Sequence, residues 1–425
     1  MNTLKIGLIG AGTVGSGVIE ILRADKELLK QRTGVSLEIT MICDRLWREK
    51  SELIGDIPAS DNADDIFNHP DIDVVVELIG GIEPAKSFHL KALQSGKSVV
   101  TANKALLARH GKEIFETAQK QKKEIGFEAA VAGALPVIKT LRRGLVANRI
   151  KSLYGILNGT CNFIISRMQN AGMEYEDALK LAQEKGFAEA DPSFDVNGND
   201  AAQKLVLLAG LSFDTEISEE DIPVEGISNI KQVDLKIASS MGWVVRLLAV
   251  AKMTEENSLL LRVHPAMIHK GHILASVVEE KNAVFFDTSN SGPCMIMGLG
   301  AGSRPTAAAV ISDLIAIGRQ RIDEPEIWLS TGKTPLNFNA TNGYRFYLRI
   351  ETQDRPGVLA QISTILAKED ISIASVHQHE GPEPVDLVII TYRADEERMT
   401  QAIEKIDQLS SVMNPTVHLR IEEDF

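Results

Sequence analysis

The chain has 425 residues, a hydrophobic fraction of 44%, a charged fraction of 24% and a formal net charge of −13. These fractions are typical of soluble globular proteins, and the length exceeds what one hydrophobic core normally holds, so we expect two or three domains. The acidic balance argues against a nucleic-acid-binding protein, which needs a clustered basic face. No apolar run reaches the roughly 18 residues of a membrane span and no signal peptide is apparent, so we expect a cytoplasmic protein.

The three cysteines lie far apart in the chain, at Cys43, Cys161 and Cys294. None belongs to a CxxC pair, so they predict neither a zinc site nor a disulfide framework. We expect three buried, reduced side chains that pack as small hydrophobic residues.

The N-terminal segment has the pattern of a dinucleotide-binding turn. An apolar strand at residues 4–9 is followed by the letters GAGTVG and then by a helical pattern. In such a turn the first glycine permits a sharp bend, the second leaves room for a pyrophosphate, and the third lets the helix pack on the strand. The N-terminus of the helix adds amide donors and a positive dipole end. The residues assigned to the cofactor are Gly10, Gly12, Thr13, Val14 and Gly15.

The next strand, at residues 37–44, ends on Asp44. A carboxylate at this place can hold the ribose 2′-hydroxyl of NAD. Arg45, Arg48 and Lys50 follow at once, and such cations can instead bind the 2′-phosphate of NADP. We assign Asp44 and Arg45 to the cofactor and leave the choice between NAD and NADP open.

Two more apolar strands, at residues 73–81 and 97–104, flank a helical segment. They continue the alternation expected of a doubly wound parallel sheet. Lys104 stands at the carboxyl end of the second strand, which is where ligands bind in such sheets. It is therefore a candidate for contact with phosphate or substrate, although a solvated loop lysine has the same pattern.

The alternation stops at residues 135–150. A strand and an amphipathic helix follow at 150–169, and an acidic stretch then leads to a helix from Asp200. Asp200 is expected to be the N-cap of this helix, and Lys204 lies one turn further on the same face. Spacing alone is compatible with a surface ion pair, with a proton donor beside a carboxylate, or with a Mg²⁺ or Ca²⁺ site that lacks EF-hand spacing.

Residues 238–330 predict two or three strands, then the glycine-rich turn GLGAG and a long apolar helix that returns to the nucleotide domain. The turn is compatible with contact to a ligand and with plain packing. His264, His269 and His272 have no carboxylate or cysteine companions at metal-ligand spacing, so we treat them as structural or surface residues.

A polar, proline-containing linker at residues 330–343 precedes the last segment. From residue 345 the chain reads strand, helix, strand, strand, helix, strand, which is a ferredoxin-like unit. The stretch DRPGVLAQI after its first strand resembles the ligand-binding turn of ACT domains, in which Asp354 and Gly357 would hold a small amino acid. Such modules also serve purely as oligomerisation sheets, because a strand edge is a ready interface.

Five motifs together resemble the homoserine dehydrogenase family: GAGTVG, TANK, FEAAVAGALP, GILNGTCNFI and GFAEADPSFDVNGNDAAQK, in the family's order. The resemblance implies interconversion of L-aspartate 4-semialdehyde and L-homoserine with NAD or NADP. It also implies an α/β architecture with a Rossmann-type nucleotide-binding domain at 1–135, an α+β catalytic and dimerisation domain at 136–330, and an ACT regulatory domain at 345–425. Hydride transfer to an aldehyde needs a proton donor and no nucleophile, and the chain contains no GxSxG turn.

The resemblance also implies roles for single residues, by motif position. Lys204 would be the general acid and base on the C4 oxygen of the substrate, with Asp200 beside it. Lys104 would lie at the junction of cofactor and substrate. Glu189 would bind the amino group of homoserine, and Asp195 would be a further contact in the substrate pocket.

A monovalent-cation site, usually for Na⁺, is implied in the same way. Its ligands would be the Glu128 side chain and the carbonyls of Val131, Gly133 and Leu135. Three of these ligands are backbone atoms, so a packed turn of small residues is an alternative reading of the same letters. Gly302 would approach the nicotinamide end of the cofactor.

We therefore expect a homo-oligomeric homoserine dehydrogenase of threonine, methionine and isoleucine biosynthesis. Its small-molecule partners would be the substrate and an amino-acid effector of the ACT domain, with L-threonine as the expected effector. Deletion of residues 345–425 should then remove the inhibition and leave much of the catalysis. Two alternatives stay open: a non-catalytic sensor of nucleotide and amino acid, and an oxidoreductase on another small amino-acid aldehyde.

Overall fold

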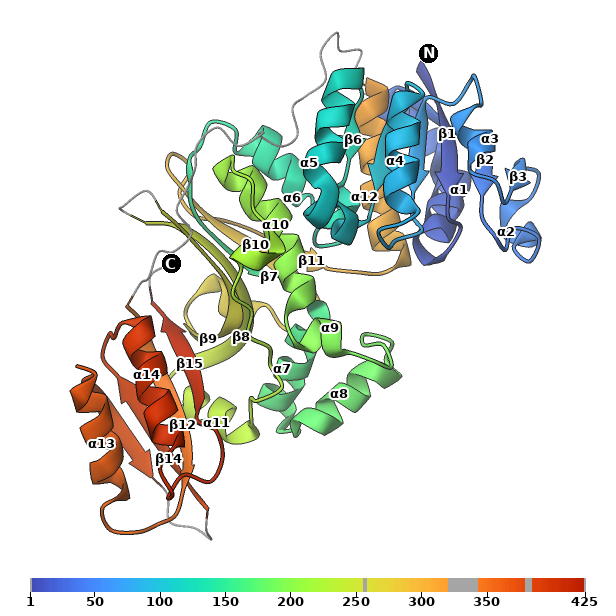
Figure 1. Cartoon of the computed structure of the whole chain (residues 1–425). Coiled ribbons are helices and arrows are strands. Elements are labelled where there is room, and N and C mark those ends of the chain that lie inside the picture. The colour runs from blue at the N-terminus through green and yellow to red at the C-terminus, as the bar shows by residue number, and fades with distance from the viewer. Residues whose placement is uncertain (1, 255–257, 320–342, 379–383, 424–425) are drawn as a thin grey trace. The chain divides into compact units, whose positions relative to one another are not determined.

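The computed structural model describes residues 2–254, 258–319, 343–378 and 384–423 (Figure 1). The chain groups into two compact units, each described by itself. Among the described residues, the first unit comprises 2–159, 200–222 and 280–319, and the second comprises 160–199, 223–254, 258–279, 343–378 and 384–423. The predicted linker at 330–343 lies outside the described residues except for Gly343. Within the described ranges no helix is long and apolar enough to cross a membrane.

The first unit contains a six-stranded parallel sheet in the order β3-β2-β1-β4-β5-β6. This is the strand order of a doubly wound nucleotide-binding sheet, so the predicted fold class is confirmed for this part. The strands are β1 (Asn2–Ile9), β2 (Val35–Cys43), β3 (Ala59–Ser60), β4 (Val74–Glu77), β5 (Ser98–Thr101) and β6 (Ile125–Gly126). The helices that connect them are α1 (Thr13–Thr33), α2 (Ser51–Ile54), α3 (Asp64–Phe67), α4 (Ala85–Gln94) and α5 (Lys104–Gln121).

Apolar strand residues and two helices form the core of this sheet. Helix α12 (Ser303–Arg319) packs in the same core as α1, as the sequence predicts for the helix that follows GLGAG. Gly15 permits close packing of α1, since a Cβ there would lie 2.1 Å from the carbonyl oxygen of Gly10. Buried members of the core include Ile6, Leu8, Val18, Val74, Val76, Ala307, Val310 and Leu314.

The first unit also holds an antiparallel ladder in the order β11-β10-β7. Its strands are β7 (Ile150–Ile156), β10 (Lys281–Thr288) and β11 (Cys294–Leu299). Between β6 and β7 the chain forms the 3₁₀ turn η1 (Glu128–Ala130), the single turn α6 (Val137–Lys139) and the π turn η2 (Thr140–Gly144).

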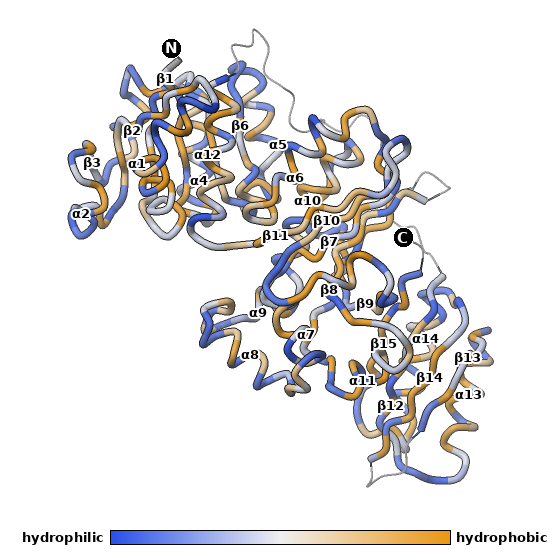
Figure 2. The backbone as a smooth tube through the Cα atoms, turned by 180° about the vertical axis from the view of Figure 1, so that it is seen from behind, coloured by the Kyte–Doolittle hydropathy of each residue, from blue (hydrophilic) through white to orange (hydrophobic). Residues whose placement is uncertain are grey.

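Helix α10 (Asn199–Phe213) is buried over most of its length and is largely hydrophobic in Figure 2, which is typical of a helix in a protein interior. The sequence predicted Asp200 as its N-cap, and this is wrong. The helix begins at Asn199, and the Asp200 carboxylate turns to the side chains of Asn158 and Lys204 instead. The short turn η3 (Glu219–Asp221) follows.

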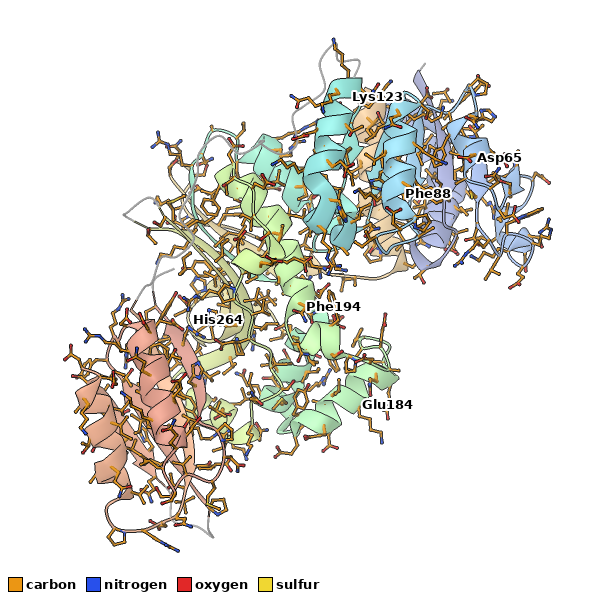
Figure 3. All side chains as sticks on the ribbon, viewed as in Figure 1. Asp65, Phe88, Lys123, Glu184, Phe194 and His264 are labelled. Carbon is orange, nitrogen blue, oxygen red and sulfur yellow. The ribbon has the colours of Figure 1, made fainter. Side chains whose placement is uncertain are left out.

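The second unit begins with helices and a long hairpin. The helices are α7 (Gly159–Ala171), α8 (Tyr175–Glu184), α9 (Ser193–Val196) and α11 (Gln232–Ser240). The hairpin pairs β8 (Trp243–Met253) with β9 (Leu259–His269) in antiparallel register, and η4 (Ile273–Ser276) comes after it. His264 on β9 is only 1% exposed, so it is a structural histidine, as predicted (Figure 3).

The C-terminal part of the second unit is the predicted ferredoxin-like fold. Its elements are β12 (Arg345–Thr352), α13 (Val358–Lys368), β13 (Ile373–Gln378), β14 (Val385–Thr391), α14 (Glu396–Asp407) and β15 (Val417–Glu422). The strands lie in the order β15-β12-β14-β13, and residues of the strands and of helices α13 and α14 form one hydrophobic core. Strand β15 also pairs in parallel with β9, so the ferredoxin-like sheet continues into the hairpin. That continuation was not predicted from the sequence.

The cysteines differ in burial. All three are free thiols, and Cys43 and Cys161 are buried as predicted. The prediction is wrong for Cys294, which is partly exposed because β11 is an edge strand with β10 as its neighbour on one side.

Candidate active site

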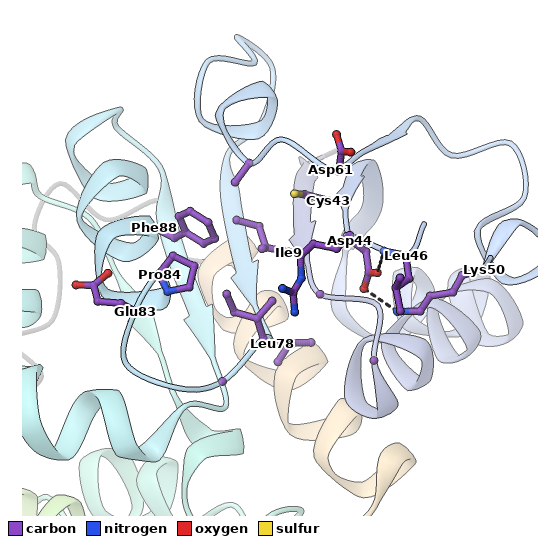
Figure 4. Close-up of a pocket in the computed structure, with 16 residues that line it drawn as sticks. Ile9, Cys43, Asp44, Leu46, Lys50, Asp61, Leu78, Glu83, Pro84 and Phe88 are labelled. Carbon is purple, nitrogen blue, oxygen red and sulfur yellow. Dashed lines mark hydrogen bonds and ion pairs between the residues drawn. The ribbon is translucent and has the colours of Figure 1, made fainter. Parts of the chain in front are cut away.

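The glycine-rich turn opens onto a cavity of about 580 Å³ at the carboxyl ends of β1, β2 and β4 (Figure 4). Gly10 and Gly12 line it, together with Asp44, Arg45 and Lys50 from the segment after β2. A Cβ at Gly12 would meet no atom within 4 Å, so the backbone there is open to a ligand. Helix α1 begins at Thr13, directly after this glycine, where a helix N-terminus favours phosphate.

Asp44 is already committed to contacts within the protein. Its Oδ2 accepts hydrogen bonds from the Ala11 amide and from Lys50 Nζ, both at 2.8 Å, and its Oδ1 accepts from the Leu46 amide at 2.8 Å. Partial burial opposes ionisation, but these hydrogen bonds prevail and lower the pKa of Asp44 below its usual value. The carboxylate therefore ties the glycine turn to β2 and presents Lys50 at the same rim of the cavity.

Lys104 is the first residue of α5 and follows the carboxyl end of β5. The Asn103 side chain caps the helix by accepting from the Leu106 amide at 3.1 Å. Lys104 Nζ lies 3.3 Å from Asp200 Oδ1, and its side chain keeps 31% exposure. The structure thus brings together Lys104 and Asp200, which are far apart in the sequence.

Lys204 and Asp200 form a buried ion pair. Lys204 Nζ donates to Asp200 Oδ2 at 2.6 Å, and the two side chains are 11% and 9% exposed. Such burial contradicts the surface-pair alternative from the sequence. Burial opposes ionisation of Asp200, but the charges of Lys204 and Lys104 outweigh it and bring its pKa to about 2.

Three further groups complete this cluster, and sequence reasoning gave them no role. Lys204 Nζ also donates to the Leu157 carbonyl at 2.6 Å, and Asn282 Nδ2 donates to the same oxygen at 2.8 Å. Asn158 Nδ2 donates to Asp200 Oδ2 at 2.9 Å. The letters GILNGT contain Leu157 and Asn158, so their proximity to a motif was the available signal, whereas nothing in the sequence pointed to Asn282.

The cluster places a lysine side chain beside a carboxylate, an arrangement that can donate a proton. Two ammonium groups flank one carboxylate that is ionised at neutral pH, so the three side chains together carry one positive charge. A buried ammonium held at two points can stabilise an alkoxide and give it a proton.

The other acidic residues of the stretch belong to the second unit. Glu189 is exposed in the loop after α8, and Asp195 is half-buried on α9, where its carbonyl accepts from the Cys161 thiol at 3.2 Å. Asp191 Oδ1 accepts from the Ser193 hydroxyl at 2.6 Å, which is a turn-shaping contact. Phe194, labelled in Figure 3, is a large hydrophobic side chain of this segment with 44% exposure.

The proposed cation ligands lie in a tight turn of the first unit. Ala132 and Gly133 both have positive φ, and Leu135 is buried. The Glu128 side chain is 2% exposed and accepts from the amides of Ile138 at 2.7 Å and Lys139 at 3.1 Å. Burial, and then the negative charge of Asp313, raise the pKa of Glu128 to about 7. A small monovalent cation fits this setting, because two buried carboxyl groups share Lys139 as their cation.

Gly302 adopts a φ of 125° directly before α12. The next residue, Ser303, donates its hydroxyl to the Thr13 carbonyl at 2.6 Å. The N-termini of α1 and α12 therefore meet at the glycine turn. The assignment of Gly302 to the nicotinamide end of the cofactor stays a prediction.

In the ferredoxin-like part, Gly357 has a φ of 95° and precedes α13. Asp354 Oδ1 accepts from Gln378 Nε2 at 3.0 Å. The predicted turn therefore joins the start of α13 to the end of the edge strand β13. In the described part of the chain no three His, Cys, Asp or Glu side chains gather as a metal site.

Comparison with family models gives three consecutive matches. Residues 10–128 match the model described as homoserine dehydrogenase, NAD binding domain, residues 136–315 match homoserine dehydrogenase, and residues 346–411 match the ACT domain. A homoserine dehydrogenase of Pseudomonas aeruginosa is 40% identical over 434 residues, which cover 100% of both chains.

Solved structures give the same result. A homoserine dehydrogenase from Thiobacillus denitrificans has a TM-score of 0.92 and 40% identity, covering 100% of this chain and 99% of its own. A hyperthermophilic archaeal homoserine dehydrogenase in complex with NADPH has a TM-score of 0.63 and 27% identity, covering 74% of this chain and 97% of its own.

Proposed function

The chain belongs to the homoserine dehydrogenase family, and from its site we propose how it performs that reaction. It is an NAD(P)-dependent oxidoreductase that interconverts L-aspartate 4-semialdehyde and L-homoserine. The observation that carries the proposed mechanism is the buried contact of Lys204 with Asp200 and, through Asp200, with Lys104. The nicotinamide nucleotide, when bound, supplies or accepts the hydride.

In the proposed mechanism Lys204 is the proton donor. When a hydride adds to the aldehyde carbon, the electron pair of the C=O bond moves to oxygen and an alkoxide forms. The Lys204 ammonium stabilises this charge and gives up a proton, and the hydroxyl of homoserine results. Asp200 and the Leu157 carbonyl hold the ammonium in place, at 2.6 Å each. In the reverse direction neutral Lys204 takes the proton from the hydroxyl.

The substrate contacts are proposed by resemblance. Glu189 and Asp195 would hold the ammonium of the amino-acid substrate, because carboxylates are the natural partners of such a group. Lys104 would meet the junction of substrate and cofactor, which its partial exposure allows. The proposed cofactor contacts of Gly10, Gly12, Asp44 and Arg45 are supported by the cavity, which these residues line. Those of Thr13 and Gly302 are supported by the meeting of α1 and α12, and Val14 and Gly15 follow Thr13 in the first turn of α1.

For the nucleotide, we infer a preference for NADP from the contacts of Asp44. Its carboxylate is held by Lys50 and two amides, and Lys50 and Arg45 both line the cavity, so these two cations could hold a 2′-phosphate. Replacing Lys50 by alanine is expected to raise KM for NADPH about 10-fold or more, since a charge-assisted contact is lost. KM for NADH should stay within about 2-fold, because Asp44 is then released to meet a ribose hydroxyl. Steady-state kinetics with both nucleotides measures this, and an equal rise for both would contradict the preference.

For the cation, we propose that Na⁺ binds beside Glu128. The pKa of Glu128 is about 7 in the folded protein, above its ordinary value of 4.5, so the folded protein keeps a proton between these pH values that the unfolded chain releases. Above about pH 7 the buried Glu128 carboxylate is ionised, and its burial then destabilises the folded protein most. A bound cation would therefore stabilise the protein most in this pH range. NaCl is expected to raise the melting temperature, relative to choline chloride, more at roughly pH 8 than at roughly pH 6.

The Glu128→Gln variant is the control for this prediction, because its side chain cannot ionise. The difference between NaCl and choline chloride should then disappear at both pH values. An unchanged difference in this variant would place the salt effect elsewhere in the protein.

The regulatory and assembly proposals rest on the ACT match and on resemblance. We propose that L-threonine binds at the turn of Asp354 and Gly357 and inhibits the enzyme, and that the protein is a cytoplasmic homo-oligomer. The division into domains at 1–135, 136–330 and 345–425 stays a proposal about folding modules. The matched ranges 10–128, 136–315 and 346–411 are in keeping with it.

A further inference from the structure

A further buried carboxylate, Glu77, lies at the carboxyl end of β4 and has no part in the chemistry above. It is 0% exposed. Its Oε1 accepts from the amides of Ile79 at 2.8 Å and Gly80 at 3.1 Å. Its Oε2 accepts from the Thr101 hydroxyl at 2.9 Å and from His89 Nε2 at 3.0 Å. Burial opposes ionisation, but the partners, with His89 first among them, lower the pKa of Glu77, so it is a carboxylate at neutral pH.

A contribution to fold stability alone does not explain why an ionised carboxylate is buried here. Taking an ionised carboxylate out of water costs several kcal/mol, and apolar side chains of similar volume often serve a fold equally well. The position is informative, because Glu77 and Thr101 are register partners at the ends of the parallel strands β4 and β5. In doubly wound sheets these ends face the ligand.

On one side, Glu77 fixes a wall of the nucleotide cavity. The two amides that it holds belong to Ile79 and Gly80, and both residues line the cavity next to the glycine turn. The fit against that turn is close, since a Cβ at Gly10 would lie 2.9 Å from Ile79 Cγ2. A shift of this wall would change the space for the nucleotide.

On the other side, Glu77 is linked to Lys104 through Thr101. The Thr101 hydroxyl donates to Glu77 and accepts from the Asn103 amide at 3.0 Å. Asn103 caps α5 through its Oδ1 and donates from Nδ2 to the Gly81 carbonyl at 2.7 Å. Lys104, the next residue, is the first of α5 and pairs with Asp200.

We propose that Glu77, held by His89 and Thr101, is a positioning residue that fixes the wall of the nucleotide cavity and the start of α5 with Lys104 at once. The proposal rests on the proposed function, in which this cavity binds the nucleotide and Lys104 meets the substrate. One hydrogen-bonded cluster would then set both nucleotide affinity and the rate of the chemical step.

The test compares Thr101→Val with Thr101→Ser. Valine keeps the shape of threonine and removes the hydroxyl, whereas serine keeps the hydroxyl and removes the methyl group. In Thr101→Val we expect the Kd for NADPH, measured by fluorescence titration without substrate, to rise about 10-fold and kcat to fall about 10-fold, because Glu77 and the Asn103 amide lose a buried partner. Thr101→Ser should keep both values within about 3-fold of the wild type.

A second variant, Glu77→Gln, keeps the shape of the side chain and removes its charge. This variant should also raise the Kd for NADPH and lower kcat. A melting curve on each sample shows whether the variant is folded at the assay temperature, and so separates these effects from unfolding. The proposal is overturned if Thr101→Val binds and turns over like the wild type, or if Thr101→Ser loses as much as Thr101→Val. NADPH binding without turnover in the wild type would instead contradict the proposed function, and the comparison of Kd values would still test the positioning of the cavity wall.

Discussion

Replacement of Lys204 by alanine is expected to lower kcat by about 10²- to 10⁴-fold, the usual contribution of a positioned proton donor. The Leu157 carbonyl and the Asp200 carboxylate both lose their donor at 2.6 Å, and no other ammonium contacts both of them in the described part of the chain. Lys104 pairs with the other oxygen of Asp200, so part of the charge remains near the site. KM for NADPH should change little, because the cavity lining does not include Lys204.

Lys112→Ala is the matched control for this prediction. Lys112 lies on α5, is 56% exposed and pairs with Glu216 at 2.8 Å, so it is a lysine in an ion pair outside the catalytic cluster. Exposed ion pairs contribute little to stability, so kcat of the Lys112→Ala variant should stay within about 2-fold of the wild type. A Lys204→Ala enzyme with full turnover and an intact fold would rule out the role of Lys204 as proton donor.

Replacement of Arg349 by methionine is expected to destabilise the second unit by about 3–5 kcal/mol, because it leaves a buried carboxylate without its cation. Arg349 on β12 donates from Nε to Asp234 Oδ1 at 2.7 Å, and the two side chains are 1% and 0% exposed. Asp234 belongs to α11, so this pair joins the ferredoxin-like part to the body that carries the β8–β9 hairpin. The expected drop in melting temperature is roughly 10 °C for a unit of this size.

Arg398→Ala supplies the control for this drop. Arg398 pairs with Asp370 at 2.8 Å within the ferredoxin-like part, and the side chains are 52% and 87% exposed. The melting temperature of the Arg398→Ala variant should stay within about 2 °C of that of the wild type. An equal drop in melting temperature in Arg349→Met and Arg398→Ala would show that the buried pair contributes no more to stability than the exposed pair.

The same contacts change what deletion of the C-terminal part can show. Removal of residues 345–425 would take away the partner strand of β9 and leave Asp234 without Arg349 and Tyr347. A truncated enzyme would then lose stability together with any inhibition by threonine. Substitution of Asp354, which is exposed and pairs with Gln378, separates the two effects better than deletion does.

Much of the nucleotide domain was predictable, because its signals are local. The run of apolar residues before GAGTVG makes β1, the glycines fix the turn, and the alternation of strands and helices gives the parallel sheet. The ferredoxin-like order from residue 345 was predictable for the same reason. Each of these patterns lies within a short stretch of sequence, in which the hydrophobic periodicity determines which face of the helix or strand is buried.

The surroundings of Lys204 could not be predicted from such patterns. Its spacing to Asp200 was compatible with a surface pair, and only the fold shows that both side chains are buried. Lys104 and Asn282 reach the cluster from distant segments through contacts that no local signal encodes. The sequence predicts only that Glu77 belongs to an apolar strand, whereas its hydrogen bond with its register partner Thr101 shows that it holds two strand ends together.

The measurement that tests the central claim most directly is steady-state oxidation of NADPH by the wild-type protein on addition of L-aspartate 4-semialdehyde, with NADPH binding measured on the same sample. We expect turnover that is at least about 100-fold more efficient than with simple aldehydes lacking the amino and carboxylate groups, since charged groups of the site would otherwise stay unpaired. Tight NADPH binding with no turnover of the semialdehyde would contradict the claim and would favour a non-catalytic sensor.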